Sequence, residues 1–297
     1  MNIFSYKHFF TQSLLILLQE ELIVFNYTTK SFIGVDILKK VFFKSLVELT
    51  GHRTSSNIIK KFTSSRWSQA LNKTFVNVYK VNVDEMEKPL QEYKSLQALF
   101  TRKLKTEARP VDSSANTIVS PVDGVLSSFG KVSEQDTFIV KGQEYNIEAM
   151  FGKEGKEDAF KKGFYFLFYL SPTDYHRIHS PIDGFVEEQW SCGGKSYPVN
   201  NLGMKYGNKP LSTNYRLISL VTGERSKVAV IKVGALNINS IHLTHEHATL
   251  KKGSEMAYFS FGSTVVLFIE QGKFQIEESL SYEMDIQQGQ RIGFIAQ

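Results

Sequence analysis

The sequence has a single cysteine, Cys192, and no long hydrophobic run. One cysteine cannot form an internal disulfide. The longest apolar run near the start, Ser13 to Leu18, ends at Gln19, whereas a membrane-spanning helix needs about 20 mainly apolar residues. The first residues also lack the charged start, apolar middle and small-residue cleavage site of a secretory signal. We therefore expect no bilayer crossing and a location on the cytoplasmic side.

Positive charge is concentrated in the first third of the chain. Residues 1–112 hold 17 Lys and Arg against 10 Asp and Glu, and the remaining residues hold 18 against 20. Basic side chains clustered near a negative surface contribute about 1 kcal/mol each. This asymmetry predicts an anionic partner, either a lipid surface or a nucleic acid, and a solvated basic face is the alternative.

The hydrophobic pattern divides the chain into a helical front and a mainly β body. Up to about residue 110, apolar residues recur at three- and four-residue steps, as at Ile37, Val41 and Phe42. From Ile118 onward, short runs rich in Val, Ile, Phe and Tyr alternate with Gly, Pro and Asn turns. We predict an α+β protein: an N-terminal extension at 1–40, a helical, basic, membrane-associating region at 41–112, and a mainly antiparallel β body at 113–297.

Two short segments of the β body are nearly identical. Ser120-Pro121-Val122-Asp123-Gly124 reappears as Ser180-Pro181-Ile182-Asp183-Gly184. Proline fixes φ and glycine tolerates positive φ, so both segments are predicted to form tight turns. Two similar turns explain the repetition, and any function depends on what stands beside them.

The run from Phe259 to Phe268 is unusual for a strand, because small and hydroxylated residues interrupt it at Gly262, Ser263 and Thr264. A bulge or hairpin turn is one interpretation. The other is that Gly262 leaves the backbone free to bend, so that the Ser263 hydroxyl attacks the preceding carbonyl and replaces the peptide bond with an ester. Elimination and hydrolysis would then leave a terminal pyruvoyl group.

A serine hydroxyl is a weak nucleophile at neutral pH, so this attack needs a base, and the base needs an orienting group. His176 and His179 are the candidates for the base, since both are predicted in a loop after the strand that ends at Leu170. Asp123 or Asp183 could orient one of them. The alternative for each histidine is a solvated loop residue.

Three further histidines are candidate metal ligands. His245 and His247 alternate along a predicted strand after His242, so two of them would face the same way. No carboxylate or cysteine at a suitable spacing completes the set. We therefore expect no metal site.

The ordered motifs together resemble the phosphatidylserine decarboxylase family, prokaryotic type, from about Val41 to Ile295. They are Tyr93-Lys94-Ser95-Leu96 through Phe100-Thr101-Arg102, Ser120-Pro121-Val122-Asp123-Gly124, Tyr175-His176-Arg177-Ile178-His179-Ser180-Pro181, Ser196-Tyr197-Pro198-Val199-Asn200, Val233-Gly234-Ala235 and Gly262-Ser263-Thr264. Each is weak alone, and their combination in this order is specific. Phe261 departs from the leucine that is commonest in the family before Gly-Ser-Thr.

The resemblance implies the roles of individual residues. The chain would cleave itself between Gly262 and Ser263 into a large chain, 1–262, and a small chain, 263–297, with Ser263 converted to pyruvoyl. His179 would be the base and Asp123 the orienting acid, in preference to Asp183. His176 matches a further family histidine, for which we expect contact with the substrate carboxylate or protonation of the product carbanion.

The resemblance also implies substrate, cofactor and location. The pyruvoyl ketone would form a Schiff base with phosphatidylserine and release CO2 and phosphatidylethanolamine, without a metal or pyridoxal phosphate. Ser196 and Asn200, with Lys195 and the basic front, are candidates for holding the headgroup phosphate. The expected partners are the membrane lipid and the two cleaved chains as a heterodimer, with no nucleic acid and the homo-oligomeric state left open. The expected location is the cytoplasmic face of the cell membrane, as a peripheral protein.

Two rival functions use the same residues or the same shape. One is a Ser-His-Asp lipid hydrolase that does not cleave itself, although Gly-x-Ser-x-Gly is absent around Ser263. The other is a non-catalytic β domain that binds lipid surfaces.

Overall fold

The computed structural model describes residues 60–199, 203–204, 207–235, 240–245, 248–260 and 263–296, with only the backbone of Ser263. The chain divides into two units, Met1–Phe43 and Lys44–Gln297, and everything below concerns the second. Our predictions for 1–59, which include the extension at 1–40, lie outside the described residues, as do those for Asn200, His247 and Gly262. Within the described part, no helix is both long and apolar enough to span a bilayer.

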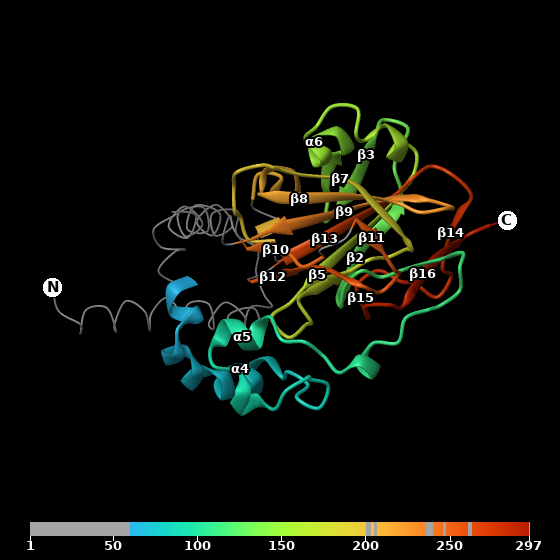
Figure 1. Ribbon diagram of the computed structural model, residues 1–297. Helices are drawn as coiled ribbons and strands as arrows, with labels where there is room; N and C mark the ends of the chain where they lie inside the picture. The colour runs from blue at the N-terminus through green and yellow to red at the C-terminus, as the bar shows by residue number, and fades with distance from the viewer. Residues whose placement is uncertain are drawn as a thin grey trace, which may run out of the picture. The chain divides into compact units, whose positions relative to one another are not determined.

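The β body is built on a sheet of eight strands in the order β11-β7-β8-β9-β13-β5-β2-β15, and every neighbouring pair is antiparallel. The predicted mainly antiparallel β body is confirmed. Figure 1 shows β9, β13 and β5 in the interior of this sheet. The strands are β2 (Gly124–Lys131), β5 (Phe164–Leu170), β7 (Gly184–Cys192), β8 (Arg216–Thr222), β9 (Lys227–Gly234), β11 (Thr249–Leu250), β13 (Ser263–Ile269) and β15 (Met284–Ile286).

Both faces of this sheet are buried, which explains why its central strands are almost continuously apolar. Along β13, Val265 and Leu267 belong to one hydrophobic cluster, whereas Val266 and Phe268 belong to another. Successive side chains of a strand point to opposite faces, so a strand covered on both sides cannot show the usual alternation of apolar and polar residues.

The first face is covered by two small sheets and the second by a hairpin with short helices. The small sheets have the orders β1-β16-β14 and β10-β12-β6. Their strands are β1 (Thr117–Val119), β6 (Arg177–His179), β10 (Ile241–Leu243), β12 (Glu255–Phe259), β14 (Phe274–Ile276) and β16 (Arg291–Ile295). The second face carries β3 (Thr137–Val140), β4 (Gln143–Asn146), α6 (Ile147–Phe151), η4 (Asp158–Phe160) and α8 (Pro210–Thr213).

The helical front is shorter than the predicted run to about residue 110. Residues 60–64 are helical, and η1 (Arg66–Leu71) and α4 (Asn72–Tyr79) follow. Helix α4 ends at Lys80, whose φ of 50° is left-handed, and beyond it only single turns form. These are η2 (Leu90–Glu92), α5 (Leu96–Phe100) and η3 (Thr106–Ala108). Pro89 and Pro110 disfavour the helical conformation in the residues before them. Our prediction relied on the apolar spacing and gave these prolines too little weight.

The front is fastened to the β body at the segment that follows β5. Thr173 donates its hydroxyl to the carbonyl of Tyr79 over 2.7 Å, and Arg102 Nη2 donates to the carbonyl of Thr173 over 2.6 Å. The same segment leads into His176, whose ring stacks on Phe100 of α5 at 3.9 Å between centroids. A candidate catalytic residue therefore lies at the joint between the two parts of this unit.

Candidate functional site

The two similar turns have the same backbone arrangement. The N–H of Gly289 donates to the carbonyl of Ser120 over 3.0 Å, and the N–H of Gly253 donates to the carbonyl of Ser180 over 2.8 Å. In both turns the serine hydroxyl donates to the carbonyl two residues further on, over 2.7 Å. The turns thus form two matching corners, each closed by a glycine of positive φ.

The two corners also bond to each other. The N–H of His179 donates to the carbonyl of Pro121 over 2.8 Å, and the N–H of Val119 donates to the carbonyl of Pro181 over 3.1 Å. His179 and Val119 occupy equivalent positions, each directly before the serine of its turn. This exchange brings His179 beside the first turn, which carries Asp123.

The ring of His179 is oriented by a backbone carbonyl. Nδ1 lies 2.8 Å from the carbonyl oxygen of Gly253, which can only accept, so Nδ1 carries the proton and Nε2 keeps the lone pair. The hydroxyl of Tyr175 lies 3.3 Å from Nε2. Burial lowers the pKa of His179, against the opposing influence of the Gly253 carbonyl and of the Glu255 and Asp123 charges. The ring is therefore neutral at pH 7 and available as a base.

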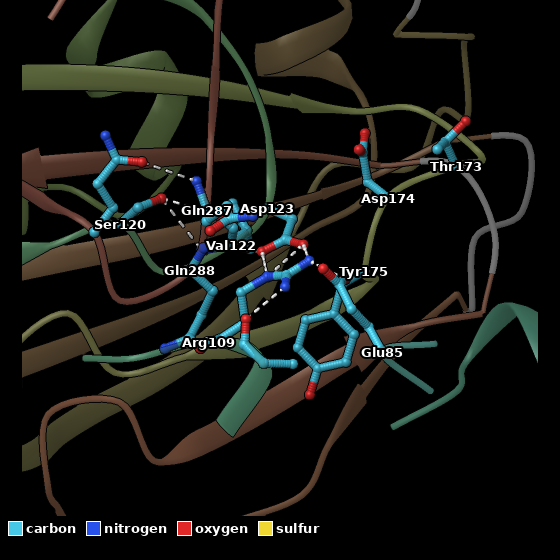
Figure 2. A network of polar contacts seen from close by, with 12 residues as sticks. Glu85, Arg109, Ser120, Val122, Asp123, Thr173, Asp174, Tyr175, Gln287 and Gln288 are labelled. Carbon is cyan, nitrogen blue, oxygen red and sulfur yellow. Dashed lines mark hydrogen bonds and ion pairs between the residues drawn. The ribbon is translucent and has the colours of Figure 1, made fainter. Parts of the chain in front are cut away.

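Asp123 is engaged by Arg109. The guanidinium donates from Nε to both carboxylate oxygens over 2.9 Å and from Nη2 to Oδ2 over 2.6 Å (Figure 2). Nη2 also donates to Glu85 over 3.0 Å, and the backbone N–H of Gln288 donates to Asp123 Oδ1 over 2.9 Å. Burial opposes the charge of Arg109, but hydrogen bonds to Asp123 and Glu85 raise its pKa above the ordinary value.

No hydrogen bond joins Asp123 to His179, both of which the structure describes. The carboxylate acts on His179 through its charge, which raises the pKa of the imidazole. The Nδ1–H of His179 is donated to the carbonyl of Gly253, and the orienting role of Asp123 stays a prediction.

His176 is completely buried. Its Nε2 lies 2.9 Å from the carbonyl of Ser171, so the neutral ring carries its proton there. Burial, and secondarily the positive charge of Arg102, lowers the pKa of His176 to about 3. At physiological pH this ring is therefore neutral, so it can make hydrogen bonds but does not act as a cationic general acid.

Ser263 is the first residue of β13. Its backbone is in register with Leu170 of β5 on one side and Gly234 of β9 on the other. The segment carrying His176 starts directly after Leu170, and the N–H of Phe259, shortly before the predicted cleavage point, donates to the carbonyl of His176 over 2.9 Å. The backbone at 263 therefore lies at the strand end that leads into the histidine motif.

Among the remaining predicted residues, Ser196 stands in a segment that the Asn214 side chain joins to Gly234, the β9 residue in register with Ser263, by donating to the carbonyls of Tyr197 and Gly234 over 2.7 and 3.0 Å. Ser196 is partly buried between Lys195, which bridges to Asn214, and Tyr197, whose N–H donates to the Asn214 side chain over 2.9 Å. His242 stacks on Tyr258, and His245 Nε2 lies 2.8 Å from Gln189 Nε2. Among the described residues, no three His, Cys, Asp or Glu side chains are grouped to hold a metal.

Comparison with known proteins decides the family. The family model for phosphatidylserine decarboxylase matches residues 96–294. The chain is 49% identical over 257 residues to the phosphatidylserine decarboxylase proenzyme of Geobacillus kaustophilus, covering 86% of this chain and 97% of that protein. The proenzymes of Anoxybacillus flavithermus and Halalkalibacterium halodurans are 48% and 46% identical, over 87% and 86% of this chain and 97% and 98% of theirs. The chain belongs to the phosphatidylserine decarboxylase family.

Three neighbours of the predicted residues were missed from the sequence of this phosphatidylserine decarboxylase family member. Arg109 pairs with Asp123, Gly253 accepts from His179, and Tyr175 reaches the same imidazole. Tyr175 stands in the quoted histidine motif and was open to notice. The Gly253 carbonyl had no side-chain signal, and Arg109 was one basic residue among the 17 of the front.

Proposed function

We propose that the chain decarboxylates phosphatidylserine to phosphatidylethanolamine in phospholipid biosynthesis, with a pyruvoyl group that it makes from its own Ser263. Its family membership over most of its length carries this proposal. The relatives are named proenzymes, which fits a precursor that is processed before it acts.

Self-cleavage would proceed with groups of the chain and one water molecule. Neutral His179 removes the hydroxyl proton of Ser263, whose oxygen attacks the carbonyl carbon of Gly262. The C–N bond then breaks to give an ester, and the imidazolium returns the proton to the amino group of residue 263. Loss of the α-proton of residue 263 then breaks its Cβ–O bond and releases the Gly262 carboxylate. The dehydroalanine that remains takes up water, loses ammonia and becomes the pyruvoyl terminus. The lowered pKa of His179 supports this role, because its lone pair is available at pH 7.

The position of residue 263 supports cleavage without loss of the fold. Cleavage before the first residue of β13 leaves all seven of its residues, Ser263–Ile269, in register with both β5 and β9. The small chain, 263–297, thus keeps a strand in the interior of the eight-stranded sheet. We infer that the two chains stay together as a heterodimer.

The residues around this terminus fit the chemistry of a pyruvoyl group. Such a ketone condenses with the substrate amine and accepts the electrons released as CO2 leaves. The role of His176, contact with the substrate carboxylate or protonation of the product carbanion, stays a prediction, because in the free chain the neutral ring donates its Nε2 proton to the carbonyl of Ser171. Ser196 and Asn200 remain candidates for the headgroup. Asp123 would set the charge around His179.

We further propose peripheral attachment to the cytoplasmic face of the membrane through the front. Trp67 is 84% exposed and Val78 50% exposed, and basic side chains share this part of the chain. Lys60 and Lys61, with Ser64 and Ser65, line an open hollow. Exposed aromatic and aliphatic groups beside basic ones suit an anionic interface.

Membrane attachment is tested with Trp67→Ala and sedimentation on vesicles containing phosphatidylserine. We expect a several-fold weaker association, and Ile139→Ala is the control, because Ile139 is 62% exposed but lies on the β3–β4 hairpin. Equal effects of the two substitutions would remove the front from this role.

Intact-mass spectrometry together with CO2 release from carboxyl-labelled phosphatidylserine tests the main proposal. We expect two chains, 1–262 and 263–297, the second beginning with pyruvoyl, and labelled CO2 from the lipid. Ser263→Ala should give one uncleaved chain and no CO2. Ser260→Ala is the matched control, since this buried neighbour donates only to the carbonyl of Ser240. A single intact chain in an active preparation would contradict the proposal and favour the hydrolase.

A further inference from the structure

Two buried arginines without a carboxylate partner differ in how their donors are satisfied. Arg216 is 2% exposed and Arg102 is 4% exposed. All three nitrogens of the Arg216 guanidinium donate to backbone carbonyls, those of Met150, Ala149, Ser212 and Asn214. Arg102 uses only Nη2, which donates to the carbonyls of Thr173 and Asp174. Its Nε and Nη1 are shielded from water and have no partner among the described residues.

The carboxylates whose charges act on Arg102, those of Asp123 and Asp174, do not accept hydrogen bonds from its Nε or Nη1. Burial lowers the pKa of Arg102, and the charges of Asp123 and Asp174 oppose this only in part. However, the Asp123 carboxylate is held by Arg109 (Figure 2). The Asp174 carboxylate accepts the backbone N–H of Ser171 over 2.6 Å. A buried charged donor without an acceptor is costly, so these N–H groups indicate an anion that the free chain does not supply.

Tyr93 provides a second donor in the same surroundings. Its hydroxyl is also shielded from water, and no atom in the described part of the chain accepts its proton. The backbone N–H of Lys88 interacts with the hydroxyl oxygen and leaves that proton available. Tyr93 and Arg102 influence each other's pKa, which places them within electrostatic range. Burial raises the pKa of Tyr93, so the phenol keeps its proton and can donate. Arg102 Nε and Nη1 and the Tyr93 hydroxyl together offer four hydrogens to one oxyanion.

This donor pair adjoins the candidate active site. The charge of Arg102 acts on His176, and its Nη2 is bonded to the segment between Leu170 and His176. We propose that Arg102 and Tyr93 bind the phosphodiester of the substrate headgroup, an inference that rests on the proposed function. Because the donor atoms are covered in the free chain, the headgroup reaches them by displacing a neighbouring side chain.

The chemistry favours the phosphodiester over the carboxylate as the bound oxyanion. The carboxylate loses its charge as CO2 departs, so a buried guanidinium on it would stabilise the ground state and slow the reaction. The phosphodiester keeps its charge throughout. Binding it equally in the ground and transition states lowers KM and leaves kcat unchanged.

The test uses the self-cleaved enzyme, with water-soluble dihexanoyl phosphatidylserine as substrate and dihexanoyl phosphatidylethanolamine as inhibitor. For Arg102→Gln we expect normal self-cleavage, a KM raised about 10- to 100-fold, and kcat within about threefold of the parent. For Tyr93→Phe we expect a several-fold rise in KM. The inhibition constant of the phosphatidylethanolamine should rise by the same factors, because this product carries the phosphodiester but no carboxylate.

Two controls separate binding from folding. Arg216→Gln and Tyr145→Phe remove donors that have protein partners. Both should lower the melting temperature and leave KM unchanged. An unchanged inhibition constant with altered kcat would assign Arg102 to the carboxylate and overturn the proposal. Unchanged KM in soluble, cleaved Arg102→Gln, or in Tyr93→Phe if the first variant does not fold, would also overturn it. Absence of cleavage and CO2 release in the parent would instead refute the proposed function.

Discussion

The corners at 120–124 and 180–184 share sequence and backbone but not environment. Each aspartate accepts one backbone N–H over 2.9 Å, Asp123 from Gln288 and Asp183 from Lys252. Asp123 is buried against Arg109, whereas Asp183 is exposed. The difference arises from the front, because Arg109 and Glu85 come from the segment before the β body and cover only the first corner.

This comparison shows how a repeated structural turn acquires a chemical role. Both aspartates accept a hydrogen bond from a backbone N–H, and this structural role alone accounts for the shared sequence. The buried ion pair belongs to the first corner only, and His179, which directly precedes the second corner, donates its N–H to the first. Substitutions at equivalent positions of the two corners therefore separate structural from catalytic effects.

The largest contrast is expected between His179→Ala and Val119→Ala. The first removes the base, so self-cleavage should slow by about 10²- to 10⁴-fold and leave a full-length chain. The second, at a completely buried position, should cost about 1–3 kcal/mol of unfolding free energy but leave cleavage intact. Time courses on denaturing gels and urea unfolding give the two measurements. Normal processing of His179→Ala would remove His179 from the role of base.

Asp123→Asn and Asp183→Asn should differ next most. Asp123→Asn leaves Arg109 buried without its main counter-charge, and we expect a loss of about 3 kcal/mol of unfolding free energy together with slower cleavage. Asp183→Asn keeps an oxygen that can accept the backbone N–H of Lys252. This substitution should change the free energy of unfolding by less than about 0.5 kcal/mol. Equal losses measured by urea unfolding would mean that the two corners are energetically equivalent.

The two glycines provide a finer contrast. Gly253 has φ +80°, and an added Cβ would lie 2.6 Å from Val111; Gly289 has φ +85°, and an added Cβ would lie 2.7 Å from the carbonyl of Pro110. Alanine at either position should cost about 1–3 kcal/mol of unfolding free energy. Only Gly253→Ala moves the carbonyl that accepts from His179, so only this variant should also slow cleavage. Similar cleavage rates in both would show that this carbonyl does not orient the base.

The smallest effect concerns pH. Burial lowers the pKa of His179, so the lone pair persists below the ordinary histidine range near pH 6.5, and the cleavage rate of the parent should stay constant from pH 8 to below that value. The Tyr175 hydroxyl, 3.3 Å from Nε2, donates to the neutral ring and stabilises it. Tyr175→Phe should therefore raise the pKa of His179 and move the fall in rate to higher pH. A profile identical to that of the parent would exclude this hydrogen bond, and Tyr145→Phe is the control.

Part of this organisation was predictable from the sequence. The β body followed from short runs of Val, Ile, Phe and Tyr between turns, and the motifs predicted the family. Local apolar spacing overestimated the helix beyond Lys80, because the left-handed residue there and the later prolines end it. The layers were not predictable, since strands such as β13 that are buried on both faces do not reveal their partners.

By itself, the sequence determined which chemistry-bearing residues exist and in what order: a glycine-serine pair in a β run, two histidines in one motif and two aspartates in matching turns. Only the tertiary structure decided which of them meet. Arg109 pairs with Asp123 and not with Asp183. The ring of His179 is oriented by the carbonyl of Gly253, 74 residues further along the chain. These contacts depend on chain segments distant in sequence packing together, and a backbone carbonyl carries no side-chain signal from which its partner can be predicted.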